Sequence, residues 1–145
     1  METTLGEKNR HLTDKEVEDL LRKGAIEPCC RAPGFYSKVF LVPKKGGKLR
    51  PVTNLEPLNS FITAPHFQMT TLKDVFQLLQ KDDWAVYLDL KDAYFHVPVH
   101  PRHRRFLQFI WRNRTYRYKC LPFGLSTSPR TFTRVTKPVV HRLRS

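Results

Sequence analysis

The sequence predicts a single α+β domain. Patterns typical of strands and of helices are mixed along the chain, without the strict strand–helix–strand alternation that predicts a parallel sheet. A length of 145 residues is enough for one ordinary domain, and a hydrophobic content of 40% permits a core. No run of about 18 apolar residues is present, so the sequence predicts no membrane-spanning helix.

Helix signals occur at three places. Residues 1–11 are polar and charged, which predicts a flexible N-terminus without a signal peptide. Thr13 and Glu16 have the spacing of a capping box, and Gly24 is placed to end the helix that they begin. Two further helix start signals are present. They are Thr71 with Asp74, and Ser128 followed directly by Pro129. The predicted helices are residues 13–24, 71–80 and 128–140, the last one strained by Pro138.

Short β-rich runs predict six extended segments. They are residues 37–43, 48–55, 84–90, 95–99, 106–111 and 115–120. The Lys-Lys-Gly-Gly sequence at 44–47 is typical of a hairpin turn, and Arg-Asn-Arg at 112–114 predicts a second hairpin. The irregular stretch between Pro57 and Pro65 separates the first hairpin from the middle helix.

Positive charge is concentrated in one part of the chain. The net charge is +13, and residues 91–145 carry 13 basic side chains against one acidic side chain, a net charge of +12. Aromatic residues are interleaved with these bases, which indicates a nucleic acid or nucleotide as the partner. Cys29, Cys30 and Cys120 form neither a disulfide framework nor a metal-ligand pattern, so we expect an intracellular, reducing setting.

One carboxylate stands out. Asp89 follows the apolar run at 85–88 and lies just before a short turn, so it is placed at the end of a predicted strand. A carboxylate on a rigid strand end can hold a divalent cation, because hard cations prefer oxygen ligands. An ordinary surface aspartate that caps a turn is the alternative, and the pattern alone leaves both open.

Three motifs in succession resemble those of reverse transcriptases. They read VPKKGGKLRPVTNLEPLN, LDLKDAYFHVPVH and CLPFGLSTSPRTF. The wording is most similar to retrotransposons of the DIRS type, and gypsy-type elements are next. The resemblance covers roughly residues 12–142. It implies the fold of a right-hand polymerase, with fingers and a partial palm in residues 12–145 and a flexible segment at 1–11.

The resemblance also implies functional residues around the first catalytic motif. Asp89 and the backbone carbonyl of Leu90 would bind metal, and the backbone amides at Asp92 and Ala93 would cradle a triphosphate. The side chain of Asp92 is then expected to cap the local backbone. Tyr94 matches the residue that excludes a 2′-hydroxyl, although an ordinary core aromatic is the alternative.

Other matching positions would complete a nucleotide site. Arg50 and one of Lys44 or Lys45 match the bases that grip the triphosphate, although exposed lysines are also common at hairpin tips. Phe123 and Gly124 match the loop that lines the nucleotide pocket, where Phe123 either contacts the base pair or braces the wall. Asn54-Leu55-Glu56 departs from the Asp-x-Arg sequence of many relatives.

The expected function follows from these residues. The chain would be a fragment of an RNA-directed DNA polymerase that acts on an RNA or DNA template with primer and on deoxynucleoside triphosphates, with two Mg²⁺ or Mn²⁺ ions. The Tyr-x-Asp-Asp hairpin, the rest of the palm, the thumb and any ribonuclease H region are absent, so we expect the chain alone not to polymerise. The alternative is a catalytically inert, basic nucleic-acid-binding protein.

Overall fold

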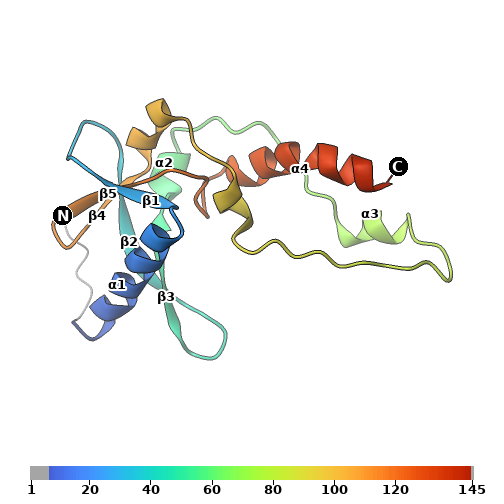
Figure 1. The fold of residues 1–145 in the computed structure, drawn as a ribbon, viewed down its shortest axis with the longest axis horizontal. Coiled ribbons are helices and arrows are strands. Elements are labelled where there is room, and N and C mark those ends of the chain that lie inside the picture. The colour runs from blue at the N-terminus through green and yellow to red at the C-terminus, as the bar shows by residue number, and fades with distance from the viewer. Residues whose placement is uncertain (1–6, 145) are drawn as a thin grey trace.

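A five-stranded mixed sheet forms the left-hand part of the molecule in Figure 1, and α4 (Ser128–Arg144) and the excursion that carries α3 (Leu72–Phe76) extend away from it to the right. The computed structural model describes residues 7–144. The sheet order is β1-β5-β4-β2-β3, and the strands are β1 (Ile26–Cys29), β2 (Tyr36–Pro43), β3 (Leu49–Asn54), β4 (Gln108–Trp111) and β5 (Arg114–Tyr118). Helix α1 (Glu7–Arg22) packs against this sheet, beside β1 and β3. The predicted α+β class is therefore confirmed.

Helix α1 begins earlier than predicted. The capping box at Thr13 is wrong, because Thr13 lies inside the helix and is fully buried. Its spacing to Val17 and Leu20 places all three on the face that packs into the core, so the helix continues toward the N-terminus without a break. Residues 7–11, predicted to be flexible, are thus helical, whereas residues 1–6 lie outside the described part. Gly24 ends the helix as predicted, with a φ of +68°.

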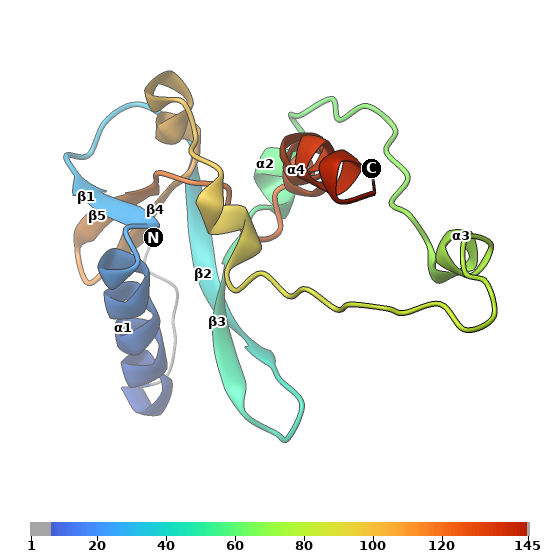
Figure 2. The ribbon, with the colours of Figure 1, turned by 45° about the vertical axis from the view of Figure 1, so that its right-hand side comes forward.

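Both predicted hairpins are present. Strands β2 and β3 pair antiparallel around a turn in which Gly46 and Gly47 both have positive φ, and this hairpin projects from the body of the molecule (Figure 2). Strands β4 and β5 pair around Arg112 and Asn113, whose φ angles of 50° and 60° are the left-handed backbone conformation that a tight two-residue hairpin turn requires. The parallel pairing of β2 with β4 joins the two hairpins into one sheet.

Two short 3₁₀ helices separate the middle of the chain from β4. They are η1 (Ala93–His96) and η2 (Pro101–Phe106). Phe106, predicted to begin a strand, therefore ends η2. Between the two helices the chain is extended, with an isolated antiparallel bridge from Pro98 to Cys120.

Residues 63–91 leave the sheet in a long excursion between α2 (Glu56–Asn59) and η1 (Figure 1). The predicted capping box of Thr71 and Asp74 is formed, but α3 (Leu72–Phe76) ends earlier than expected. The strand predicted over 84–90 is wrong. These residues are exposed and have no regular secondary structure. A strand requires hydrogen bonds from a neighbour, and none of the five strands within residues 7–144 pairs with this segment.

Helix α4 (Ser128–Arg144) closes the described chain and runs past the predicted end at Val140. Ser128 was expected to cap this helix. Instead its hydroxyl is fully buried and donates a hydrogen bond to the carbonyl of Pro122 at 3.0 Å. Within residues 7–144, no helix has the length and apolar character to cross a membrane.

Candidate functional site

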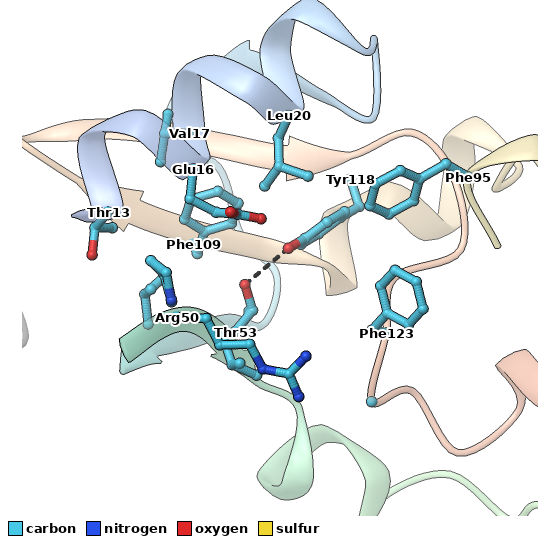
Figure 3. Close-up of a pocket in the computed structure, with 14 residues that line it drawn as sticks. Thr13, Glu16, Val17, Leu20, Arg50, Thr53, Phe95, Phe109, Tyr118 and Phe123 are labelled. Carbon is cyan, nitrogen blue, oxygen red and sulfur yellow. Dashed lines mark hydrogen bonds between the residues drawn. The ribbon is translucent and has the colours of Figure 1, made fainter. Parts of the chain in front are cut away.

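A pocket of about 420 Å³ lies where α1, β3, β5 and the loop at 121–127 meet (Figure 3). It is lined by three residues that the sequence had singled out, namely Arg50, Phe123 and Gly124. Figure 3 shows the Arg50 guanidinium pointing toward the side of the pocket that Phe123 bounds. The structure therefore brings β3 and the loop together, although 73 positions separate Arg50 from Phe123 in the sequence.

The back wall of the pocket is held by a hydrogen bond between two strands. The hydroxyls of Tyr118 on β5 and Thr53 on β3 lie 2.9 Å apart. Either hydroxyl can donate to the other, and burial raises the pKa of Tyr118 to about 12. The contact fixes the spacing between β3 and β5, which are not neighbours in the sheet.

Glu16 supplies a carboxyl group to the same pocket. Burial raises its pKa, and the carboxylates of Asp19 and Asp92 add to the effect, while Lys23 and Arg50 oppose it. The pocket is therefore lined by an acidic and a basic side chain. The sequence predicts Glu16 as part of a capping box, although its spacing of four residues from Leu20 also places it on the buried face of α1.

An aromatic cluster borders the pocket. The Tyr94 ring lies 5.0 Å from the ring of Phe123 and 5.5 Å from that of Phe132 on α4. Phe95, which lines the pocket, contacts Phe123 edge-on at 5.6 Å. Such tilted and edge-on contacts favour a fixed arrangement of the rings. Tyr94 is thus placed beside the same loop residue that faces Arg50, and Phe132 is a member that the sequence did not reveal.

Asp92 does not cap the backbone as predicted. It lies before η1 in the left-handed region, at φ 52°, and its side chain makes no capping hydrogen bond. Instead its carboxylate pairs with Lys23 of α1 at 3.1 Å, and Lys23 also binds Asp19 at 2.7 Å. These two partners raise the pKa of Lys23, Asp19 first, so the ion pair stays charged. The turn that carries Asp92 and Ala93 is thereby tied to α1.

Asn59 holds the loop that contributes Phe123 and Gly124. Its amide donates to the carbonyl of Gly124 at 2.8 Å, and its side-chain oxygen accepts from the backbone N–H of Ser126, also at 2.8 Å. The two bonds fix both sides of the loop with a single side chain. No signal within the sequence identified this role, because the partner backbone lies 65 or more positions away.

The remaining predicted residues lie away from the pocket. Lys44 and Lys45 are exposed at the tip of the β2–β3 hairpin and do not line it. Asp89 and Leu90 lie in the exposed excursion. Over the described chain, no three His, Cys, Asp or Glu side chains are grouped so that they could hold a metal ion.

Comparison with known proteins identifies the family of this chain. A family model for reverse transcriptase (RNA-dependent DNA polymerase) matches residues 42–145, which contain all the predicted site residues. The chain belongs to the reverse transcriptase family. In this family the domain occurs within retroviral and retrotransposon polyproteins.

Two relatives illustrate the relationship of this reverse transcriptase domain. The genome polyprotein of Petunia vein clearing virus (isolate Shepherd) is 32% identical over 125 residues, which cover 83% of the chain and 6% of the polyprotein. The retrovirus-related Pol polyprotein from transposon 412 of Drosophila melanogaster is 27% identical over 126 residues, 83% of the chain and 10% of the polyprotein. The chain thus spans a small part of the length of these relatives.

Solved structures share the fold. A prototype foamy virus protease-reverse transcriptase superimposes with a TM-score of 0.80 at 22% identity, over 98% of this chain and 19% of the viral chain. The foamy viral enzyme in complex with an RNA/DNA hybrid gives a TM-score of 0.77 at 16% identity, with the same coverage. The expected fold, a partial reverse transcriptase domain, is therefore confirmed.

Proposed function

We propose that this domain binds the incoming deoxynucleoside triphosphate in an RNA-directed DNA polymerase. One observation carries the proposal: Arg50 of β3 and the Phe123–Gly124 loop line one pocket, with Tyr94 packed against Phe123. A guanidinium can bind two phosphate oxygens at once, and an aromatic wall suits a sugar and base. Residues 12–145 form the fingers and the first part of the palm in this proposal.

The other predicted residues have supporting roles. One of Lys44 or Lys45, at the exposed tip of a projecting hairpin, contacts the outer phosphates as a point charge. The backbone amides at Asp92 and Ala93 face the triphosphate, and the ion pair of Asp92 with Lys23 keeps their turn in place. Gly124 lets the backbone approach the nucleotide closely, at a φ of +87° that other residues rarely adopt.

Divalent metal ions are general cofactors of this family. In our proposal the Asp89 carboxylate and the Leu90 carbonyl contribute ligands to a site for Mg²⁺ or Mn²⁺ in the whole polymerase. The residues described here do not fit a two-ion site by themselves, since one carboxylate stands alone.

The partners follow from the same proposal. A template strand of RNA or DNA, its primer and deoxynucleoside triphosphates are the substrates, and the place of action is inside the cell. The foamy viral structures in complex with double-stranded DNA and with an RNA/DNA hybrid support nucleic acid as the partner class. The motif wording supports an origin in a DIRS-type retrotransposon.

Steady-state primer extension tests the proposal in a polymerase that carries this domain within a longer, active chain. We expect Arg50→Gln to raise the KM for a deoxynucleoside triphosphate about tenfold or more, because a charge-assisted phosphate contact is lost. Arg114→Gln, the same change on an exposed arginine of β5, is the matched control and leaves KM unchanged. An unaltered KM in Arg50→Gln would remove Arg50 from the nucleotide site.

A second pair of variants tests Asp89. Asp89→Asn is expected to abolish extension, whereas Asp82→Asn is expected to retain it. Asp82 lies in the same exposed excursion and has a φ of +69°, a conformation that asparagine accepts. Extension at the wild-type rate by Asp89→Asn would contradict the assignment of this residue.

A further inference from the structure

A second pocket, of about 490 Å³, lies between α2, η2 and the loop at 121–127 and shares no residue with the first. Its floor is apolar and buried, and includes Leu58, Val99 and Leu107. Leu121 and Leu125 of the loop line this second pocket, whereas Phe123 and Gly124 line the first. The loop thus separates two distinct sites.

The rim of the second pocket is made of flat rings. Phe61 is 80% exposed and Phe106 is 39% exposed, which is unusual for phenylalanine in a folded domain. His100 and His103 are also exposed, and their rings lie 5.8 Å apart at the pocket edge. Exposed aromatic groups that surround an apolar floor can take up another planar ring by stacking.

Positive charge lies next to these rings. The guanidinium of Arg105 is 4.9 Å from the centroid of the Phe106 ring, and Arg102 is exposed two positions after His100. Arg104 between them is already engaged by Glu27 and by the carbonyl of Val99. Among the described residues, by contrast, neither Arg102 nor Arg105 forms an ion pair, and no acidic side chain lines the pocket.

The backbone of η2 is fixed before any ligand arrives. The carbonyl of Arg105 accepts hydrogen bonds from the Phe35 N–H at 3.0 Å and from the Gln108 side-chain amide at 2.7 Å. Gly34 passes so close to this carbonyl that an added Cβ would collide with it. The segment that carries the rings and arginines is therefore held in place, which lowers the entropic cost of binding.

The geometry points to a binding subsite for single-stranded nucleic acid at the second pocket, with one unpaired base among Phe61, Phe106 and the histidines and its phosphates on Arg102 and Arg105. Alternating rings and phosphates are the chemistry that matches an aromatic pocket with a cationic rim. Double-stranded nucleic acid does not match it, because its bases are already stacked. The subsite is separate from the nucleotide pocket and does not depend on the proposed polymerase function.

Fluorescence anisotropy with the purified 145-residue chain tests the inference, using short labelled oligothymidylate. The decisive comparison is an abasic oligomer of equal length, which keeps the phosphates but has no bases. We expect oligothymidylate to bind about tenfold or more tightly than the abasic oligomer, since stacking of one base contributes on this scale. Equal affinity for the two oligomers would overturn the proposal.

Variants then locate the effect. Phe61→Ala and Phe106→Ala are expected to weaken oligothymidylate binding about tenfold and to leave abasic binding unchanged. If Phe106→Ala fails to fold, as judged by circular dichroism, the strongly exposed Phe61 decides alone. If Phe61→Ala bound oligothymidylate as tightly as the wild type, the proposal that a base binds in this pocket would be refuted.

Charge variants complete the test. Arg102→Gln with Arg105→Gln should weaken binding of both oligomers. Arg31→Gln with Arg114→Gln removes the same charge from exposed arginines that line a different pocket, and should have a clearly smaller effect. If the two double variants weakened binding equally, the binding would be general electrostatic attraction, and the proposed phosphate contacts of Arg102 and Arg105 would be refuted. Displacement of the oligomer by an acidic aromatic peptide at lower concentration would instead assign the pocket to a protein partner.

Discussion

The surroundings of Tyr94 suit a residue that selects nucleotides by the shape of their sugar. Its ring is fixed by contacts at 5.0 Å and 5.5 Å with two phenylalanine rings, one from the loop and one from α4. It is only partly buried, so one part of the ring remains available to a ligand. A ring held in this way cannot move aside to accept an extra hydroxyl on a sugar.

We therefore expect Tyr94→Ala to relax sugar selection in an active polymerase that carries this domain. The kcat/KM for a ribonucleotide should rise about tenfold or more relative to that for the deoxynucleotide, because the clash is removed. Tyr94→Phe is the control and should keep most of the selectivity, since the ring fills the space. Equal losses on both substrates in Tyr94→Ala would show a core aromatic whose removal leaves a cavity.

Gly34 is required by a close approach between two segments. An alanine Cβ at this position would collide with the backbone carbonyl of Arg105 and with the side chain of Gln108. Backbone cannot rotate away as a side chain can, so Gly34→Ala should lower the free energy of unfolding by about 1–3 kcal/mol. Urea denaturation measures the change. Ala32→Ser also adds one atom, on an exposed neighbour, and should stay within about 0.5 kcal/mol of the wild type.

Helix α1 is fastened to the β4–β5 hairpin by one carboxylate. Asp14 accepts a hydrogen bond from the Trp111 indole at 2.8 Å and pairs with the Arg112 guanidinium, also at 2.8 Å. These bonds, Arg112 first, hold the pKa of Asp14 below its usual value of 3.8. The contact joins α1 to the turn of the β4–β5 hairpin.

The lowered pKa predicts a pH-dependent contribution to stability. Since the folded form releases the proton more readily, the stabilisation is present above about pH 4 and is lost as pH falls through the folded pKa. Asp14→Asn should therefore lower the free energy of unfolding by about 1 kcal/mol at pH 7, a value typical of a partly exposed charged hydrogen bond. The difference from wild type should shrink below pH 4. Glu18→Gln, on an exposed position of α1, is the control, and a difference independent of pH would contradict the mechanism.

Local elements were predicted well from the sequence, and elements that depend on distant partners were not. The turns at Gly46-Gly47 and at Arg112-Asn113 follow from their own residues, so both hairpins were correct. The strand expected over 84–90 has the right composition but pairs with none of the five strands, so no ladder forms. Helix α1 extends to Glu7 because the buried face of the sheet accepts Thr13, which the capping pattern had placed outside.

In the candidate site, too, the sequence predicted individual residues but not their distant partners. Motif positions predicted Arg50, Phe123 and Gly124, and these three meet in one pocket. The residues that hold the site together were missed, since Asn59 and Lys23 act through partners far away in the sequence. Sequence patterns identify a residue type at a position, whereas its supporting contacts are created only by tertiary packing.

Net charge differs strongly between the first and second parts of the chain. Residues 1–90 are almost neutral, with 13 basic and 12 acidic side chains, and residues 91–145 have a net charge of +12. The carboxylates of the first part are partly used inside the fold: Asp14 pairs with Arg112 and Glu27 with Arg117. Helix α4 lies beside the sheet and adds two more bases to this part of the chain, Arg130 and Arg134. A surface of one sign attracts phosphate backbones over a distance.

This asymmetry predicts strongly salt-dependent binding of duplex DNA through the second part of the chain. Each neutralised phosphate should contribute about −0.9 to the slope of log affinity against log salt, because counterions are released. Arg130→Gln with Arg134→Gln should make the slope shallower by about 1–2. Lys15→Gln with Lys38→Gln removes the same charge from the balanced first part and should leave the slope nearly unchanged. Affinity measured by anisotropy across a salt series checks both, and a flat affinity from low to moderate salt would show that the positive surface does not bind the phosphate backbone.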